Sequence, residues 1–188
     1  MDKKTLGTIL FVGVFAIVGV GMVLAFGNFS SGSSDPVAAY KASVAASEKE
    51  VEKHAQGVSA PNFNLPLLGG GIVGLADFKG KKPVILAFWT TWCPNCRRNM
   101  PIMSAYYTEY KDKVGLVGIN MQEDTKTVAD FVAAGKTSFP IALDSGSTAQ
   151  AYGVQYTNTH VLVDKDGVII KTVVGDIKED DFELLTSL

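Results

Sequence analysis

Two cysteines, Cys93 and Cys96, are the residues of this sequence best suited to chemistry. They are the only cysteines among 188 residues, and only Pro94 and Asn95 separate them. A disulfide-stapled fold needs more cysteines at wider spacing, so this pair is interpreted as a local reactive or metal-binding motif. A thiolate can attack a disulfide, and a second thiol beside it can then resolve the mixed disulfide that forms.

The segments on either side of Cys93 predict where it lies. The apolar run at residues 84–89 is typical of a buried strand. Pro94 fits the first turn of a helix over residues 94–111, because the N–H group that proline lacks would have no partner there. We therefore expect Cys93 at a helix N-terminus, where free N–H groups and the helix dipole lower the pKa of a thiol.

These positions assign different roles to the two cysteines. Cys93 is predicted to be the nucleophile, and Cys96, three residues later on the same helix face, the resolving cysteine. Trp92, Pro94 and Asn95 are expected to surround them. Arg97 and Arg98 add positive charge nearby, although they could simply be solvated.

Two other interpretations of the cysteine pair are a structural zinc site and an inert pair. Structural zinc needs four ligands. The remaining candidates, His54 and His160, are far away in sequence and are not suitably spaced.

The rest of the chain after residue 60 alternates between strand-like and helix-like segments. Gly69-Gly70-Gly71 lacks the strand-to-helix context of a phosphate loop and is expected to be a turn between two N-terminal strands. The Asp166-Gly167 step predicts a hairpin turn. A βαβ half followed by a ββα half predicts an α/β sandwich with a mixed central sheet. The expected strands are residues 114–120, 140–143, 160–164 and 168–174, and the expected helices are residues 125–135, 147–152 and 178–188.

The N-terminus predicts a membrane anchor in residues 1–27. Residues 6–26 contain no charge, and about 20 apolar residues suffice to cross a bilayer. Lys3 and Lys4 precede the run and no basic residue follows it until Lys41, which predicts a cytoplasmic N-terminus and a single-pass protein whose domain lies outside the cytoplasm. A cleaved signal peptide is the alternative, although its apolar core is usually shorter.

Residues 28–59 are expected to connect the anchor to a globular domain at residues 60–188. They begin with a polar linker, after which Asp35-Pro36 and several alanines predict a helical stalk. Partial disorder is the other interpretation of this stretch. His54, which lies within it, is expected to be solvated.

The charge pattern excludes one broad class of function. The formal net charge is −2, and basic and acidic residues are interspersed. This is not the electrostatic footprint of a nucleic-acid binder.

Several short segments of the domain at residues 60–188 match the pattern of one known group of proteins. They are residues 60–65, 75–81, 88–93, 152–154 and 162–167, together with Pro101. On these segments the domain resembles the TlpA/ResA/DsbE group of membrane-anchored extracytoplasmic thioredoxins. The resemblance implies a thioredoxin-like three-layer sandwich, disulfide exchange with protein substrates, a membrane or extracytoplasmic thiol redox partner, and no bound cofactor. It also implies that the loop at Thr157 and Asn158 faces the cysteines.

Three positions depart from the pattern of that group. Asn158 stands where the group has a cis-proline, and because a non-proline cis bond costs about 3–4 kcal/mol we expect the Thr157–Asn158 peptide to be trans. Ala87 replaces a buried acid of thioredoxins, and Asn99 replaces a glutamate that many members carry. Without either acid, proton transfer to Cys96 would rely on water or a neutral side chain.

The sequence thus predicts an extracytoplasmic thiol–disulfide oxidoreductase, and the family resemblance slightly favours reduction of substrates. Pro94 and the missing acids keep an oxidising role open. A second hypothesis is copper handling by Cys93, Cys96 and His160. A third is a thiol peroxidase, for which Thr90 and Cys93 match part of the signature, although Leu86 occupies the place of its proline.

Overall fold

The computed structural model describes residues 37–38, 41–42, 57–135 and 137–188. The predicted anchor and most of the predicted stalk lie outside these residues, although residues 37–38 and 41–42 are helical. Within the described ranges, no helix is both long and apolar enough to span a bilayer. The globular domain belongs to the unit that begins at Val44.

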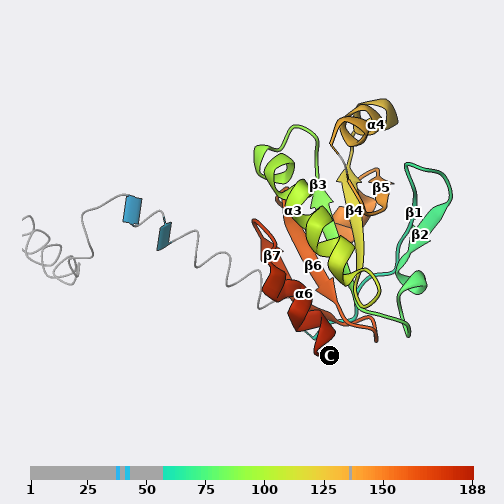
Figure 1. The fold of residues 1–188 in the computed structure, drawn as a ribbon, viewed down its shortest axis with the longest axis vertical. Coiled ribbons are helices and arrows are strands. Elements are labelled where there is room, and N and C mark those ends of the chain that lie inside the picture. The colour runs from blue at the N-terminus through green and yellow to red at the C-terminus, as the bar shows by residue number, and fades with distance from the viewer. Residues whose placement is uncertain (1–36, 39–40, 43–56, 136) are drawn as a thin grey trace, which may run out of the picture. The chain divides into compact units, whose positions relative to one another are not determined.

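A five-stranded sheet forms the centre of this domain (Figure 1). Its strand order is β5-β4-β3-β6-β7, in which β3, β4 and β5 run parallel and β6 and β7 are antiparallel to their neighbours. The predicted mixed sheet is therefore confirmed. The strands are β3 (Val84–Trp89), β4 (Gly115–Met121), β5 (Ile141–Asp144), β6 (Thr159–Val163) and β7 (Ile169–Val174).

Four α-helices connect and flank these strands. They lie within one or two residues of the predicted bounds, because capping residues and apolar periodicity are local signals. Asp124, for example, caps α4 by accepting a hydrogen bond from the Thr127 N–H. The helices are α3 (Pro94–Tyr110), α4 (Thr125–Ala134), α5 (Ser147–Ala151) and α6 (Glu179–Thr186).

An antiparallel hairpin precedes the sheet, as predicted. It consists of β1 (Asn64–Pro66) and β2 (Ile72–Gly74), and the 3-10 helix η1 (Leu75–Asp77) follows it. Gly70 and Gly71 both have positive φ in the turn, which glycine adopts without steric cost.

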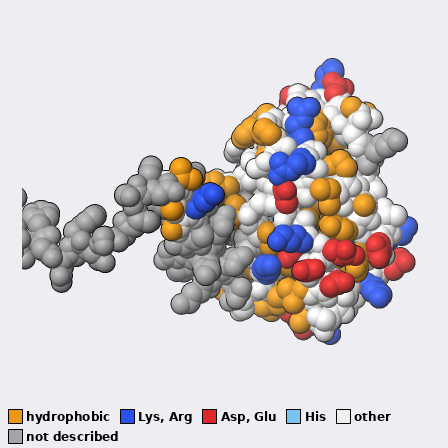
Figure 2. All heavy atoms as spheres, turned by 60° about the vertical axis from the view of Figure 1, so that its left-hand side comes forward, with side chains coloured by type: hydrophobic (Ala, Val, Ile, Leu, Met, Phe, Trp, Pro, Cys, Tyr) orange, Lys and Arg blue, Asp and Glu red, His pale blue; other side chains and the backbone are white. Residues whose placement is uncertain are grey.

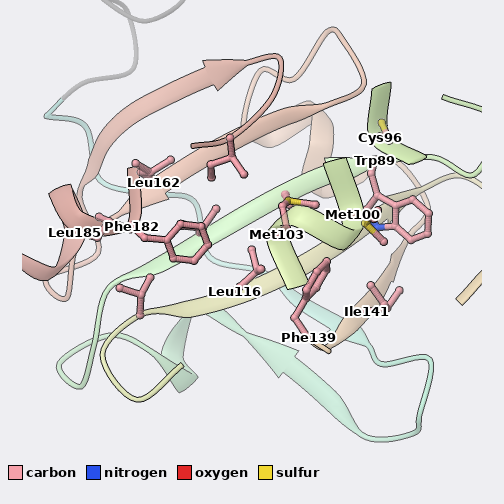
Figure 3. Close-up of a cluster of buried hydrophobic side chains, with 14 of the residues drawn as sticks. Trp89, Cys96, Met100, Met103, Leu116, Phe139, Ile141, Leu162, Phe182 and Leu185 are labelled. Carbon is pink, nitrogen blue, oxygen red and sulfur yellow. The ribbon is translucent and has the colours of Figure 1, made fainter. Parts of the chain in front are cut away.

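Alternating residues of the strands build two cores, one on each face of the sheet. The first packs against α3 and α6 and contains both cysteines, as Figure 3 shows for Cys96, Met100 and Phe182. The second packs against the N-terminal hairpin and α5. The result is the predicted three-layer, thioredoxin-like sandwich, with the cysteines between the sheet and α3.

Candidate active site

Cys93 and Cys96 lie where β3 ends and α3 begins. All six residues of β3 are buried. Their packing fixes the position at which the chain leaves the sheet and enters the loop before Cys93. The two cysteines form a disulfide, and their Cα atoms are 5.3 Å apart. Cys93 is 4% exposed and Cys96 is 1% exposed, so Cys93 is the more accessible of the two.

Cys93 is the N-cap of α3, as predicted from Pro94. Its Sγ accepts a hydrogen bond from the backbone N–H of Cys96 over 3.1 Å. That N–H is one of the donors that have no partner within a helix, and an anionic sulfur accepts such a bond more strongly than a neutral one. The site is therefore built to stabilise negative charge on Cys93.

Three predicted neighbours of the cysteines, Trp92, Pro94 and Asn95, are exposed around Cys93. The Trp92 side chain is 67% exposed, which is unusual for a tryptophan and leaves an apolar surface next to Cys93.

Glu123 fixes the loop that leads into Cys93, a role that sequence reasoning missed. Its carboxylate accepts hydrogen bonds from the backbone N–H of Thr91, over 2.7 Å, and from the Thr91 hydroxyl. It also accepts one from the side-chain amide of Asn120, at the end of β4. Because β3 and β4 are parallel neighbours, their carboxyl ends meet at one edge of the sheet. The position of Glu123 just after β4 could therefore have predicted that it lies near the loop after β3.

The loop at Thr157 and Asn158 lies at the same end of the sheet. Phe88 of β3 pairs with Thr159 of β6, which brings the two residues before Thr159 alongside the segment that leads to Cys93. The Thr157–Asn158 peptide is trans, as predicted, since the described chain has no cis bond. Asn158 instead has a φ of 59°, a left-handed conformation that asparagine tolerates better than most residues.

Asp176 ties this loop to α3 and is a second residue that sequence reasoning missed. It accepts hydrogen bonds from the Asn158 amide over 3.1 Å and from Arg98 over 2.7 Å. Arg98 also donates to Asn95, between the cysteines. The Arg98 hydrogen bond is the main cause that lowers the pKa of Asp176.

A groove of about 540 Å³ is lined on one side by Asn95, which lies between the two cysteines in the sequence, and by Arg98. Figure 2 shows basic and acidic side chains interleaved on this face. The other residues that line the groove come from β7 and the segment around α6: Lys171, Val173, Val174, Gly175, Asp176, Lys178, Asp180 and Asp181.

His160 lies in β6 and is 1% exposed, so it is a packed strand histidine. Its Nε2 is 3.4 Å from the side-chain amide nitrogen of Asn99. No group of three histidine, cysteine, aspartate or glutamate side chains in the described part of the chain is arranged to hold a metal ion. The copper hypothesis for Cys93, Cys96 and His160 therefore gains no geometric support here.

Known proteins similar to this chain support the same chemistry as the geometry. A family model described as Redoxin matches residues 55–187. This chain belongs to the Redoxin family. The thiol–disulfide oxidoreductase ResA of Bacillus thuringiensis subsp. konkukian is 39% identical to this Redoxin-family chain over 134 residues, which cover 70% of this chain and 77% of that protein.

Solved structures agree on the fold of this Redoxin-family chain. A putative thiol:disulfide interchange protein DsbE from Chlorobium tepidum superposes with a TM-score of 0.62 at 34% identity, covering 69% of this chain and 92% of that one. StoA from Bacillus subtilis gives a TM-score of 0.60 at 31% identity, and the match covers 69% of this chain and 98% of StoA. Together with the Cys93–Cys96 disulfide, these likenesses identify a thiol–disulfide oxidoreductase with a thioredoxin-like fold.

Proposed function

We propose that this protein is a membrane-anchored oxidoreductase that exchanges disulfides with exported proteins, using Cys93 as the nucleophile and Cys96 as the resolving cysteine. The hydrogen bond from the Cys96 N–H to Cys93 Sγ carries this assignment. It supports Cys93 as the sulfur whose thiolate the helix N-terminus stabilises. Cys96 is almost fully buried and is less exposed than Cys93, which suits it to resolve the mixed disulfide that forms at Cys93.

In the reducing direction, the Cys93 thiolate attacks one sulfur of a substrate disulfide. A mixed disulfide forms, and the other substrate sulfur leaves with the electron pair of the broken bond. Cys96 then attacks the Cys93 sulfur, the remaining substrate sulfur leaves, and the Cys93–Cys96 disulfide forms. An extracytoplasmic or membrane thiol partner returns the pair to its dithiol state.

The surface around Cys93 supports a protein as the substrate. Exposed Trp92 offers an apolar contact on one side, and Tyr156, which is 60% exposed, precedes the loop at Thr157 on the other. The groove beside Asn95 adds polar and charged contacts. An extended substrate segment that crosses Cys93 meets aromatic and polar partners within one small area.

Serine variants of the full-length protein test the two roles. Cys93→Ser is expected to abolish reduction of insulin disulfides, because no thiolate remains at the helix N-terminus. Cys96→Ser is expected to accumulate mixed disulfides that survive alkylation and non-reducing electrophoresis. Glu109→Gln, an exposed position near the end of α3, is the control and is expected to behave like the parent. Insulin reduction that persists in Cys93→Ser would refute the assignment.

We propose reduction as the direction of exchange, which the family resemblance favours slightly. The position of Pro94 at the helix N-terminus and the absence of acids at Ala87 and Asn99 make the oxidising direction the competing outcome. The equilibrium potential of the Cys93–Cys96 couple decides between them. A value near about −270 mV marks a reductant, and a value near about −120 mV marks an oxidant.

The uncharged run at residues 6–26 supports insertion of this protein in the bilayer as a single span, with the N-terminus in the cytoplasm. Membrane fractions from a bacterial expression host should keep the protein after carbonate extraction. Protease added to the outer side of the membrane should digest the domain at residues 60–188. Release of the protein by carbonate, or protection of the domain from protease, would contradict this topology.

A further inference from the structure

Three turns lie side by side at the end of the sheet where β3 and β4 begin and β6 ends. The turn before β3 meets the turn after β6, where the Gly80 N–H donates a hydrogen bond to the Lys165 carbonyl over 2.6 Å. It also meets the turn between α3 and β4, where the Lys82 amine donates to the Lys111 carbonyl over 2.7 Å. The three turns are residues 79–82, 111–113 and 164–167.

These turns carry a positive charge that the rest of the domain does not share. They contain six lysines and three aspartates, whereas the rest of residues 57–188 contains six basic and eleven acidic residues. None of the six lysines forms an ion pair within the described part of the chain, and all except Lys82 are exposed. Their charge therefore acts mainly on the surroundings of the protein. The lysines are Lys79, Lys81, Lys82, Lys111, Lys113 and Lys165.

Acidic side chains border this surface on the side where α6 packs against α3. Three glutamates act on Tyr110, the last residue of α3, through their negative charge. The turn before β3 lies away from them and contains three lysines and no acid. The positive surface is therefore centred on this turn and on Lys165 beside it. The glutamates are Glu109, Glu179 and Glu183.

Two exposed apolar side chains lie at the same end of the domain. Val58 is 53% exposed, and its carbonyl accepts a hydrogen bond from the Ile169 N–H, just after the third turn. Leu188 is 57% exposed and follows Leu185 of α6 by three residues. Figure 3 shows Leu185 at the end of the core layer that lies away from Cys96. Basic and apolar side chains on one surface are the combination by which proteins attach to anionic lipid head groups.

The chain also enters the domain at this end. The Ala60 N–H donates to the Gly167 carbonyl over 2.8 Å, and the Gly57 N–H donates to the Ile169 carbonyl over 2.8 Å. The chain that precedes Gly57 includes the uncharged run at residues 6–26, which we propose as the membrane span. A protein anchored through that run is tethered at the end of the domain that carries the lysines.

The cysteines lie at the opposite end of the sheet. β3 begins directly after the turn at residues 79–82 and ends at the loop that leads into Cys93 (Figure 1). Its six residues span about 20 Å, at about 3.3 Å per residue. A membrane in contact with the lysines would leave the surface around Cys93 open to the aqueous side.

We propose that the six lysines form a docking surface, the lysine face, which rests on anionic lipid head groups of the membrane that holds the anchor. This inference rests on the proposed anchor. The anchor keeps the domain at a high effective concentration near the lipid, so a weak attraction suffices to dock it. Each lysine near an anionic surface strengthens such an attachment by about 5-fold. Docking directs Cys93 and Trp92 toward exported proteins.

Lysine acetylation of the full-length protein in lipid nanodiscs tests this docking. The discs contain phosphatidylcholine alone or phosphatidylcholine mixed with phosphatidylglycerol, and peptide mass spectrometry gives the acetylation rate of each lysine. At about 0.1 M salt, phosphatidylglycerol should slow the acetylation of Lys79, Lys81 and Lys165 by at least about 5-fold. At about 1 M salt, where charges act over only about 3 Å, this protection should disappear. Lys126, at the start of α4 near the dithiol end, should react equally in both kinds of disc.

Two matched variants identify the lysine face as the cause of the protection. Lys81→Gln should reduce the protection of Lys79 and Lys165 by about 5-fold, the effect of one lysine. Lys126→Gln makes the same substitution at an exposed lysine of the opposite end and should leave the protection unchanged. Both variants should reduce insulin disulfides at the rate of the parent, which shows that the domain is folded.

The outcomes separate the docking from the anchor. Protein that elutes apart from the discs would refute the anchor and the docking with it. Protein that elutes with the discs but is acetylated equally in both lipids would overturn the docking and leave the anchor intact. Protection in membranes of a bacterial host, without protection in the discs, would indicate an acidic protein as the partner and would also overturn the proposal.

Discussion

The side-chain amide of Asn158 donates a hydrogen bond to the carboxylate of Asp176 over 3.1 Å. The backbone next to Asp176 makes a second bond to this loop, because the Gly175 N–H donates a hydrogen bond to the Asn158 carbonyl over 2.8 Å. Asp176 also pairs with Arg98 of α3. The loop beside the cysteines is therefore held by asparagine and a carboxylate, where the TlpA/ResA/DsbE group has a proline.

Substitutions at Asn158 should separate its backbone role from its side-chain role. Asn158→Gly keeps the left-handed conformation and loses only the bond to Asp176, which is expected to cost about 1 kcal/mol in the free energy of unfolding. Asn158→Ala loses the same bond and is strained at a φ of 59°, so it should be less stable than the glycine variant by about 1 kcal/mol. Urea unfolding measures both values. Equal stability of the two variants would show that the backbone conformation imposes no strain.

Asp176→Asn should remove a small, pH-dependent part of the stability. The pKa of Asp176 is lowered mainly by its hydrogen bond to Arg98, so the ion pair stabilises the fold above the pKa of an unfolded aspartate, about 3.9. This contribution is lost as the pH falls through the lower folded value. Both side chains are well exposed, at 58% for Arg98 and 38% for Asp176, so we expect no more than about 1 kcal/mol. The difference in unfolding free energy between the parent and the variant, measured from pH 6 to pH 2.5, should shrink toward acid.

Glu123→Ala should loosen the loop that leads into Cys93. It removes the acceptor of three hydrogen bonds, two from Thr91 and one from Asn120, and is expected to cost about 2–3 kcal/mol of stability. The attack of Cys93 on Ellman's reagent should also slow, because the N-cap geometry depends on this loop. Glu109→Ala in α3 is the matched control, because Glu109 is an exposed glutamate. It should change the free energy of unfolding by no more than about 0.5 kcal/mol and should leave the rate of attack on Ellman's reagent unchanged. Normal attack rates in Glu123→Ala would show that α3 alone positions Cys93.

Acid should destabilise the oxidised protein through His160. Burial lowers the pKa of this ring from 6.5 to about 4. The unfolded chain therefore binds a proton at a higher pH than the native state, and the stability that neutral His160 contributes is complete above pH 6.5 and falls as the pH drops toward 4. A shift of this size corresponds to about 3 kcal/mol. Unfolding free energies measured between pH 7 and pH 4 should show this slope in the parent and a flatter profile in His160→Gln.

The sequence by itself determined the reactive pair and the local structure around it. Cys93, Pro94 and Cys96 are close along the chain, and a buried strand before them and a helix after them follow from short-range patterns. The N-cap position of Cys93, the trans peptide at Asn158 and the glycine turn between β1 and β2 were predictable for the same reason.

Only the tertiary structure decided what surrounds that pair. Glu123 reaches Thr91 across 32 positions of the chain, Asp176 reaches Asn158 across 18, and His160 reaches Asn99 across 61. Each contact depends on strand order and register, and a slip of one residue in β6 would turn His160 to the opposite face of the sheet. Local patterns do not encode that register, because it is fixed by how all the apolar faces pack together.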